Sequence, residues 1–556
     1  MFQHLTGKLE SEQVEFLTRT LVSLKSYNST VGETDKALFI QQLIGSFPYF
    51  KEHPMEVWAQ NIPADPFGRK NIFARVKGKT RKTILFHAHI DTVGTEDYGS
   101  LQDMAHHPEF LQKFFVDFDG DEGLKLEAMS GKWLFGRGAL DMQSGIAVHL
   151  VNLLHFSEQK EKLNGDVLFL FNADEESQHR GVLSAIHELY EMKQNGTKFI
   201  AGLNNDFISP MYEGDTQKYI YTGAAGKVLP CFYIYGREAH VGDVLQSIDP
   251  THIAANIISE INHNLALTEK IDGEFILPPT CLYLKETKEE YNVQTPVSAK
   301  LYFNYFVYEK AASEILNDLK WRTSFICTTY EKVAKERFEV FRQKQGFPET
   351  DLNWSVHVVT LNEFIEELTS KGVDVDAVME VAYRLNHEQG KDERELAFQL
   401  VEALQQCDPD RSPRVILFYA PPYLPHNYLD KDNEFGSKVK KVLEDTLEQL
   451  SDHYDEKFVL KRFFPYLADG SFLSIPGSEK DIQAFKKNMP MMDVLYPLPT
   501  QKIKELNIPS INLGVYGKDG HKWTERVYKP YTFEVLPKLI RTVAMELLKI
   551  KCEGVE

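Results

Sequence analysis

Apolar and polar residues alternate most clearly around residues 83–91, in the stretch TILFHAHID. Successive side chains of a strand point to opposite faces. One face of the predicted strand is therefore apolar, and the other carries His87, His89 and Asp91. Two imidazoles and a carboxylate on one face of an otherwise hydrophobic strand are unusual in a core, and they mark this face as a candidate functional surface.

The same patterns predict further strands at residues 165–174 and 199–208, with amphipathic helices at about 142–156 and 181–193. The opening 80 residues favour helices that lead to the edge of a sheet. Strands that alternate with helices, and that contain short continuous apolar runs, are typical of a mostly parallel sheet covered by helices on both faces. The predicted fold class is therefore α/β.

The pattern changes near Tyr221, where strands rich in Phe and Tyr (227–235 and 297–309) flank a helix at 249–265. This texture predicts a separate α+β module inserted into the first domain. A long charged helical stretch then covers Val373–Gln406.

Buried-strand character returns at 414–423 and 508–517, before a closing helix at 534–550. We therefore expect residues 1–222 to form the first segment of a catalytic domain, residues 223–370 the inserted domain, and residues 371–556 the second catalytic segment. The second boundary is the less sharply marked of the two.

Composition narrows the class of partner. The chain has 62 basic and 81 acidic residues in 556, a formal net charge of −19, which argues against nucleic acid or an anionic membrane as the main partner. Five cysteines lie far apart with no CxxC pair, so neither a disulfide framework nor a thiolate zinc site is indicated. The polar N-terminus and the lack of an apolar run of about 18 residues predict a cytoplasmic protein.

Polar residues follow the predicted strands at five places. In open α/β sheets ligands gather at the carboxyl ends of the strands, so residues at these ends meet in space. The five places hold His89 with Asp91, Asp141, Glu175 with Glu176, Asp206, and His521. Two imidazoles with several carboxylates and no thiolate suit Zn²⁺, or Mn²⁺ or Co²⁺.

Each place has an ordinary explanation when it is taken alone. A histidine near a strand end is often a core residue, acidic residues before a helix complement its dipole, and an aspartate before a helix is usually an N-cap. Two metal ions, however, need one bridging carboxylate, terminal ligands for each ion, and a further carboxylate as base. Five such signals at successive strand ends favour the metal site.

At these residues the chain resembles the M20 family of metallopeptidases and deacylases. The resemblance rests on HAHIDTV, GRGALDMQSG, ADEES, Asp206, GREAHVG and GKDGHKWTE, in the family's order and spacing over nearly the whole chain. It implies a zinc-exopeptidase-like catalytic domain with an inserted lid and dimerisation domain. The length, HIDTVGTEDYGSLQD and YFNYF look most like the branch named for the arginine-utilisation protein RocB.

The resemblance also implies residue roles. His89 and Asp206 would bind one metal ion, and Glu176 and His521 the second. Asp141 would bridge the two ions, with a cis peptide bond to Met142. Glu175 would be the general base, and Asp91 would orient His89.

His240, in the inserted domain, would stabilise the oxyanion, in dimeric members at the partner's active site. The inserted domain departs from the family pattern at one place. Where the family has D-x-R, with an Arg that commonly binds a substrate carboxylate, this chain has Asn304 and Phe306. Neither can form the bidentate pair that Arg offers. Arg237 is an alternative clamp, and a substrate without a carboxylate there is another explanation. Asn304, and Asp469 and Ser471 of YLADGSFLS, are further candidate substrate contacts.

We therefore predict a di-metal hydrolase that cleaves an amide bond of a small amino-acid derivative, an N-acyl amino acid or dipeptide, in amino-acid or arginine catabolism. Two alternatives stay open, an amidohydrolase acting on a carbamoyl or amidino C–N bond and a non-catalytic binding protein of the same fold. The expected cofactors are two divalent ions, most simply Zn²⁺, and no nucleotide motif of the GxGxxG type is present. A homodimer through the inserted domain is expected, with no membrane partner.

Overall fold

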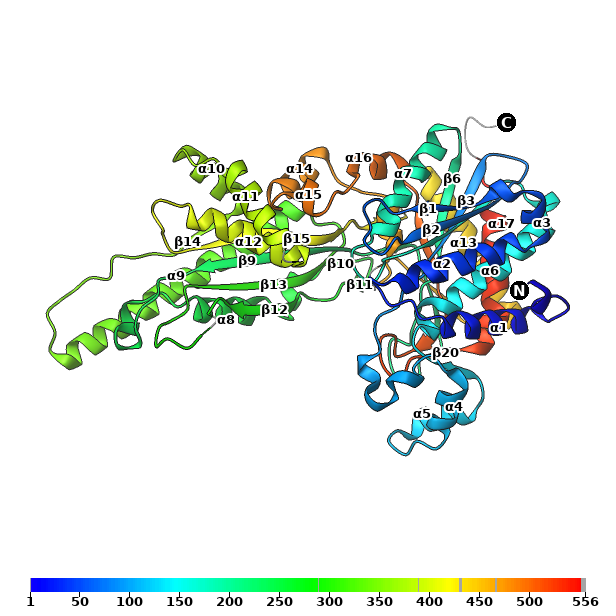
Figure 1. Ribbon diagram of the computed structural model, residues 1–556, viewed down its shortest axis with the longest axis horizontal. Helices are drawn as coiled ribbons and strands as arrows, with labels where there is room; N and C mark the ends of the chain where they lie inside the picture. The colour runs from blue at the N-terminus through cyan, green and yellow to red at the C-terminus, as the bar shows by residue number, and fades with distance from the viewer. Residues whose placement is uncertain (1, 289, 389, 430–432, 466–467, 552–556) are drawn as a thin grey trace. The chain divides into compact units, whose positions relative to one another are not determined.

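A computed structural model describes residues 2–288, 290–388, 390–429, 433–465 and 468–551, and the chain divides into two compact units (Figure 1). Unit 1 comprises Met1–Ala225, His426–Ile475 and Pro499–Glu556. Unit 2 comprises Gly226–Pro425 and Pro476–Leu498. Each unit has its own sheet and its own hydrophobic core.

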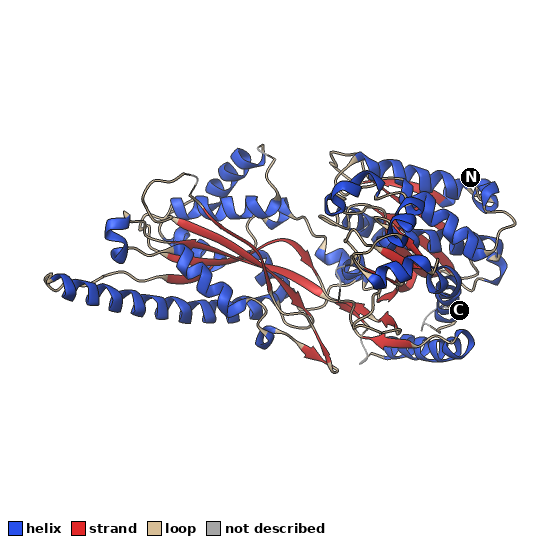
Figure 2. Ribbon diagram, turned by 90° about the horizontal axis from the view of Figure 1, so that it is seen from below, coloured by secondary structure: helices blue, strands red, loops and turns tan. Residues whose placement is uncertain are grey.

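Unit 1 is built on an eight-stranded sheet with helices on both sides of the strands (Figure 2). In spatial order its strands are β1 (Val57–Asn61), β2 (Lys70–Val76), β5 (Asp166–Asn172), β3 (Lys82–His89), β6 (Lys198–Asn204), β18 (Ser510–Leu513), β7 (Lys218–Tyr221) and β17 (Phe458–Lys461). The central run β5-β3-β6-β18 is parallel. The predicted α/β architecture is confirmed, with antiparallel strands added at the margins.

Smaller sheets complete unit 1. Strand β4 (Trp133–Phe135) joins β19 (Gly517–Lys518) and β20 (Arg526–Tyr528), and β8 (Gly223–Ala224) pairs with β16 (Asn427–Tyr428). The helices of unit 1 are α1 (Glu10–Ser23), α2 (Val31–Gly45), α3 (Pro48–Glu52), α4 (Pro108–Val116), α5 (Glu122–Met129), α6 (Ser144–Glu158), α7 (Arg180–Gln194), α13 (Glu434–Tyr454), α16 (Thr500–Leu506) and α17 (Leu536–Leu547).

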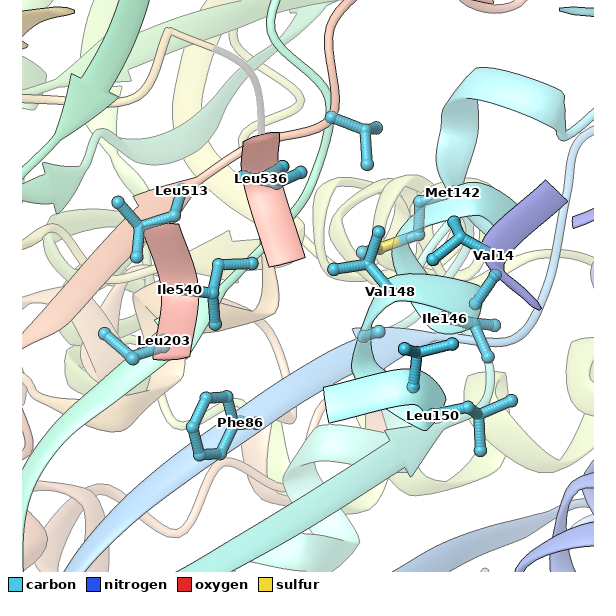
Figure 3. Packing of buried hydrophobic residues seen from close by; sticks show 14 of the residues in the cluster. Val14, Phe86, Met142, Ile146, Val148, Leu150, Leu203, Leu513, Leu536 and Ile540 are labelled. Atoms are coloured by element: carbon cyan, nitrogen blue, oxygen red, sulfur yellow. The ribbon is translucent and has the colours of Figure 1, made fainter. Parts of the chain in front are cut away.

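The core of unit 1 lies between the sheet and helices α1, α6 and α17 (Figure 3). Helix α6 is apolar on nearly all sides because it is covered by α1 and α17 as well as by the sheet. Phe86 of β3 faces this layer and stacks on Phe169 of β5, with ring centroids 4.4 Å apart. The apolar face of the 83–91 pattern is thus the core face of the central strand.

Unit 2 contains a five-stranded sheet in the order β12 (Thr280–Glu286), β13 (Ser298–Val307), β9 (Gly226–Tyr235), β15 (Arg414–Leu424) and β14 (His357–Thr360), and a hairpin of β10 (Lys270–Ile271) and β11 (Glu274–Phe275). Its helices are α8 (Pro250–Ile261), α9 (Ala312–Gln345), α10 (Leu361–Ser370), α11 (Val375–His387), α12 (Glu393–Gln406), α14 (Glu479–Lys487) and α15 (Met492–Leu495). Apolar residues of α10–α12 form a core against β9 and β15.

The division differs from the expected one at the second boundary. Residues 371–425 and 476–498 belong to unit 2, although the sequence placed them in the second catalytic segment. The reason is β15, whose apolar run pairs with β9 rather than with a strand of unit 1. A strand covered on both faces has the same pattern in either sheet, so its apolar run alone does not assign it. The role of unit 2 as a lid or dimerisation domain stays a prediction.

The helices of the described residues were also compared with the length and hydropathy that a membrane crossing requires. Among them, no helix is both long and apolar enough to cross a bilayer.

The core contact of Phe86 leads to a stability prediction. Phe86→Ala should lower the free energy of unfolding of unit 1 by about 3–5 kcal/mol, because the substitution leaves a cavity beside Phe169 in a fully buried layer. Urea-induced unfolding of the full chain measures the change. Leu126→Ala on α5, where the side chain is 57% exposed, is the control and should cost less than about 0.5 kcal/mol. Equal shifts in the two variants would contradict this placement of the core.

Candidate metal centre

The carboxyl ends of the central parallel strands bring the predicted site residues together. Strand β3 ends at His89, which lies beside Asn172, the last residue of β5. His87 lies beside Asn204, the last residue of β6. The segments that carry the acidic residues begin directly after these strands, so their side chains converge on one edge of the sheet.

Two sets of donor atoms share Asp141. One set consists of His89, Asp141 and Asp206, and the other of Asp141, Glu176 and His521, with the donor atoms of each set within 4.8 Å of one another. Asp141 Oδ1 lies 2.9 Å from His89 Nε2, and its Oδ2 lies 2.9 Å from His521 Nε2. His521 Nε2 is also 2.8 Å from Glu176 Oε1. The two oxygens of Asp141 thus face different sets, which is the arrangement of a bridging carboxylate.

These donors fit two divalent ions in type and in spacing. Imidazole nitrogens and carboxylate oxygens are ligands of Zn²⁺ and also suit Mn²⁺ and Co²⁺. Ligand atoms of one tetrahedral zinc ion lie roughly 3.3 Å apart. The contacts of 2.8–2.9 Å made by His521 would therefore have to open by only about half an ångström. That the five residues bind metal stays a prediction.

Electrostatics favour a cation at this place. Burial opposes the charged imidazolium of His521, but hydrogen bonds to Asp141 and Glu176 outweigh it and raise the pKa to about 11. Burial raises the pKa of the Glu175 carboxyl well above its ordinary value, and burial together with the charge of Asp141 raises that of Asp206. The carboxylates crowd one another in a buried space, and the histidine protons offset part of that repulsion.

Asp91 supports the site through hydrogen bonds to the backbone next to it. It is fully buried, and its carboxylate accepts hydrogen bonds from the backbone N–H groups of Glu175 (3.1 Å) and Glu176 (3.0 Å). His89 Nδ1 lies 3.1 Å from the backbone oxygen of Asp91 and 3.6 Å from its carboxylate. Asp91 is thus placed to orient His89, mainly through its backbone oxygen, and it also fixes the turn that carries both glutamates.

A second support fixes Asp141, and the sequence reasoning missed it. Glu525 accepts hydrogen bonds from the backbone N–H groups of Leu140 (3.0 Å) and Asp141 (3.2 Å), and Arg137 pairs with Glu525 at 2.7 Å. The peptide bond between Asp141 and Met142 is cis, as the resemblance implied. In the sequence, Glu525 is only a Glu shortly after His521, and Arg137 is only the Arg of GRG. Neither position indicates which residue it contacts.

The turn before Glu175 has a buried ionic support that the sequence reasoning also missed. Arg69 lies 2.5 Å from the carboxylate of Asp174, and Glu33 accepts a hydrogen bond from the Asp174 backbone N–H at 2.9 Å. Asp174 has a positive φ of 67°. The residue next to the predicted base is therefore fixed at its backbone and at its side chain.

Asp469 and Ser471 differ in their surroundings. Asp469 lies beside Glu175, and its carboxylate accepts from His179 Nδ1 at 2.9 Å and from the Asn172 side chain. Ser471 is fully buried and donates to the backbone oxygen of Ala225. A substrate contact by Ser471 would need movement of this loop, so Asp469 is the better candidate of the two.

His87 completes the polar face of β3. It is buried, and burial lowers its pKa to about 4, so the ring is neutral. Its Nε2 has no hydrogen-bond partner in the part of the chain that the structure describes. The polar face of the strand thus carries one predicted metal ligand and a buried neutral imidazole that is not a member of either donor set.

His240 and Asn304 belong to unit 2, and their roles at the metal centre stay predictions. His240 is exposed, and its Nδ1 accepts from the Gly242 N–H at 3.1 Å. Phe306, at the family's Arg position, pairs with Lys227 near the start of β9, whereas Arg237 follows the other end of that strand. About ten residues of extended chain separate the two positions, roughly 30 Å. Arg237 therefore does not stand in for the missing Arg at the same place.

Comparison with known proteins shows which sequences this chain is similar to. A model of peptidase family M28 matches residues 71–229, the part that holds His89, Asp141, Glu175, Glu176 and Asp206. Protein RocB of Bacillus subtilis is 50% identical over 542 residues, which are 97% of this chain and 95% of that protein. The match to RocB extends over nearly the whole chain and therefore decides the family more firmly than the shorter M28 match.

Two further similarities are more distant. A succinyl-diaminopimelate desuccinylase of Psychrobacter arcticus is 25% identical over 283 residues, 50% of this chain and 61% of that enzyme. The solved structure of an M20 family metallo-carboxypeptidase from Sulfolobus solfataricus has a TM-score of 0.49 and 11% identity, and covers 96% of this chain and 99% of its own. Likeness at that level concerns the course of the chain and says nothing about the reaction.

The shared position of Asp141 leads to a prediction about metal content. His521→Ala should lower the bound metal from two equivalents per chain to one, because it removes a donor from the second set alone. Elemental analysis after dialysis against metal-free buffer measures the content. His187→Asn, an exposed position on α7, is the control and should retain both equivalents. Unchanged metal in His521→Ala would contradict its role as a ligand.

The raised pKa of His521 leads to a prediction about pH. At neutral pH the metal-free protein holds a proton on this imidazole, and the metal must displace it. Apparent metal affinity should therefore increase with pH, by up to about tenfold per unit for each proton released. Isothermal titration calorimetry at about pH 6 and about pH 8, in buffers of different ionisation enthalpy, measures affinity and proton release. An affinity that does not depend on pH would contradict the proton-filled cluster.

Proposed function

Because the chain belongs to the RocB family, we propose that it is an M20-type di-metal hydrolase that cleaves an amide bond in a small amino-acid derivative. The observation that carries this proposal is the position of Glu175. Its carboxylate has no hydrogen-bond partner among the described residues, yet it lies within 4.8 Å of His89 and Glu176, one donor from each set. A general base must lie beside the metal ligands without being one of them, and Glu175 lies outside both donor sets.

Two divalent ions, held by His89, Asp141 and Asp206 and by Asp141, Glu176 and His521, would supply Lewis acidity that polarises a carbonyl group and makes water easier to deprotonate. Zn²⁺ is our first choice, and Mn²⁺ and Co²⁺ suit the same donors. Nitrogen and oxygen donors without a thiolate support this choice of metals, and leave the choice between them to experiment.

The side chains of this protein would do the remaining work. Glu175 accepts a proton from water at its carboxylate, and the oxygen of that water attacks the carbonyl carbon. Asp91 keeps Glu175 and Glu176 in place through their backbone N–H groups. His240 would donate to the oxygen that becomes negative, an interaction typically worth about 2.7–4 kcal/mol. A homodimer through unit 2, in which His240 serves the partner's site, and action in the cytoplasm are parts of the same proposal.

We propose an N-acyl amino acid or a dipeptide as the substrate. The desuccinylase among the relatives carries a deacylation in its name, and the resemblance is to the branch named for the arginine-utilisation protein RocB, which favours derivatives of arginine or a related amino acid. Asp469, next to Glu175, and Asn304 of unit 2 are candidate contacts for such a substrate.

A second candidate reaction is hydrolysis of a carbamoyl or amidino C–N bond. The observation that favours it is Phe306, which stands where the family's carboxylate-binding Arg would be and pairs with Lys227 at the other end of β9 from Arg237. A substrate whose carboxylate is bound elsewhere, or that has none at this position, is compatible with a ring there. The same base and donor sets would serve this reaction.

Glu175→Gln separates the base from the metal ligands. The variant should keep two metal equivalents and lose at least about 10²-fold in kcat, because an amide cannot accept the proton of water. The assay measures amine release from N-acyl, N-carbamoyl and dipeptide derivatives of arginine, ornithine and other amino acids. Glu191→Gln, an exposed carboxylate on α7, is the control and should behave as the wild type.

The outcomes identify the reaction as well as the residue. Release by the wild type that disappears in Glu175→Gln supports the hydrolase, and the substrate that is cleaved names the bond. Full activity in Glu175→Gln would end the assignment of the base. Wild-type protein that holds two metal ions, binds a member of the panel tightly and cleaves none would instead identify a binding protein of the same fold.

A further inference from the structure

A buried polar cluster lies beside Glu175 and outside both donor sets. A ring nitrogen of His179 and carboxylate oxygens of Glu175 and Asp469 lie within 4.8 Å of one another. His179 and Asp469 are only 4% and 3% exposed. Neither belongs to the two metal sets, and the sequence reasoning did not single out His179 at all. The only signal was a histidine four residues after Glu175.

The backbone and the packing fix the His179 ring in this place. His179 is the residue before α7, with a left-handed φ of 58°, and its N–H donates to the backbone oxygen of Asp174 at 2.7 Å. The ring packs against Phe472, with centroids 5.1 Å apart. The short helical turn Asp469–Leu473 supplies both Asp469 and Phe472, so one segment orients the ring from two sides.

Asp469 determines which nitrogen of His179 carries hydrogen. A carboxylate accepts, so Nδ1, 2.9 Å from Asp469 Oδ1, is the donor. The Asn172 side chain donates to the other carboxylate oxygen, which leaves Asp469 no freedom to turn away. Nε2 is then the nitrogen that can exchange a proton with a ligand, and in the described part of the chain it has no partner. A histidine backed by a carboxylate is the arrangement of general acid–base pairs on unrelated folds.

From this geometry we infer that His179, paired with Asp469, is a second proton-transfer residue that protonates the leaving nitrogen. The inference rests on the proposed function. Water gives its proton to Glu175, and its oxygen forms a bond to the carbonyl carbon. Glu175 passes that proton to the unprotonated Nε2 of His179, directly or through one bridging water. When the C–N bond breaks, the electron pair stays on nitrogen, which takes the proton from Nε2, and both side chains regain their starting states.

This division of labour follows from position. Glu175 lies next to both donor sets, where it takes the proton of water, whereas His179 lies on the Asp469 side of Glu175. A single carboxylate would have to reach both the water and the departing nitrogen. A ring nitrogen of His179 and a carboxylate oxygen of Glu175 lie within 4.8 Å of each other, so neither side chain has to leave its position for both sites to be served.

The test compares two leaving groups in one enzyme. The substrate is the N-acyl amino acid or dipeptide that the panel identifies, paired with the analogue in which sulfur replaces the scissile nitrogen. A thiolate departs without a proton, whereas an amine does not. His179→Asn should lower kcat on the amide by about 10²-fold and on the thioester by less than about threefold, with two metal equivalents retained. Asn is chosen because it tolerates the left-handed backbone at this position.

Two further variants complete the design. Asp469→Asn should show the same selective loss, because an amide no longer fixes the Nδ1–H form of His179. His187→Asn, which replaces an exposed histidine within α7, should leave both substrates unaffected. Wild-type activity of His179→Asn on the amide, or an equal loss on amide and thioester, would overturn the inference, since a merely structural role affects both substrates alike. Wild-type protein that cleaves neither substrate would contradict the proposed function itself. That outcome is distinct from those that contradict only the role of His179.

Discussion

Repulsion among buried carboxylates is the constraint on which this site depends. Asp91, Asp141, Glu175 and Asp206 are all less than a tenth exposed and meet at one edge of the sheet. Removing charge from water is costly unless charges of opposite sign compensate. In the metal-free protein two histidines provide that compensation, and the raised pKa of His521 is its consequence. Divalent ions would offset the repulsion more completely, because each ion has two positive charges, whereas a protonated histidine has one.

The segments that carry these carboxylates are held by buried hydrogen bonds and an ion pair. Asp91 holds the backbone of both glutamates, Glu525 holds the backbone of Asp141, and Arg137 neutralises Glu525. Such pairs leave the ligand side chains little freedom to separate, although like charges favour separation. The parallel strands bring the segments together, and the buried pairs then fix the direction of each donor.

The sequence predicted those features of the fold and site that follow from the local alternation of apolar and polar residues, or from the rule that parallel strands end at one edge of a sheet. The alternation at 83–91 placed Phe86 in the core and His89 on the polar face, and parallel strands required the segments after β3, β5 and β6 to meet. The contacts of Glu525 and His179 could not be predicted, because each joins positions that are hundreds of residues apart and only tertiary packing brings them together. The strand β15 was assigned to the wrong segment for a related reason, since burial on both faces removes the alternation that would distinguish its partners.

The central claim is that two metal ions and one free carboxylate make this chain a hydrolase. Its most direct test is a titration of metal-free protein with Zn²⁺ or Mn²⁺, in which bound metal and amine release from the substrate panel are followed together. The account predicts that hydrolysis is absent without metal and reaches its full rate at two ions per chain. Full hydrolysis without metal, or two bound ions with no hydrolysis of any amide in the panel, would contradict it.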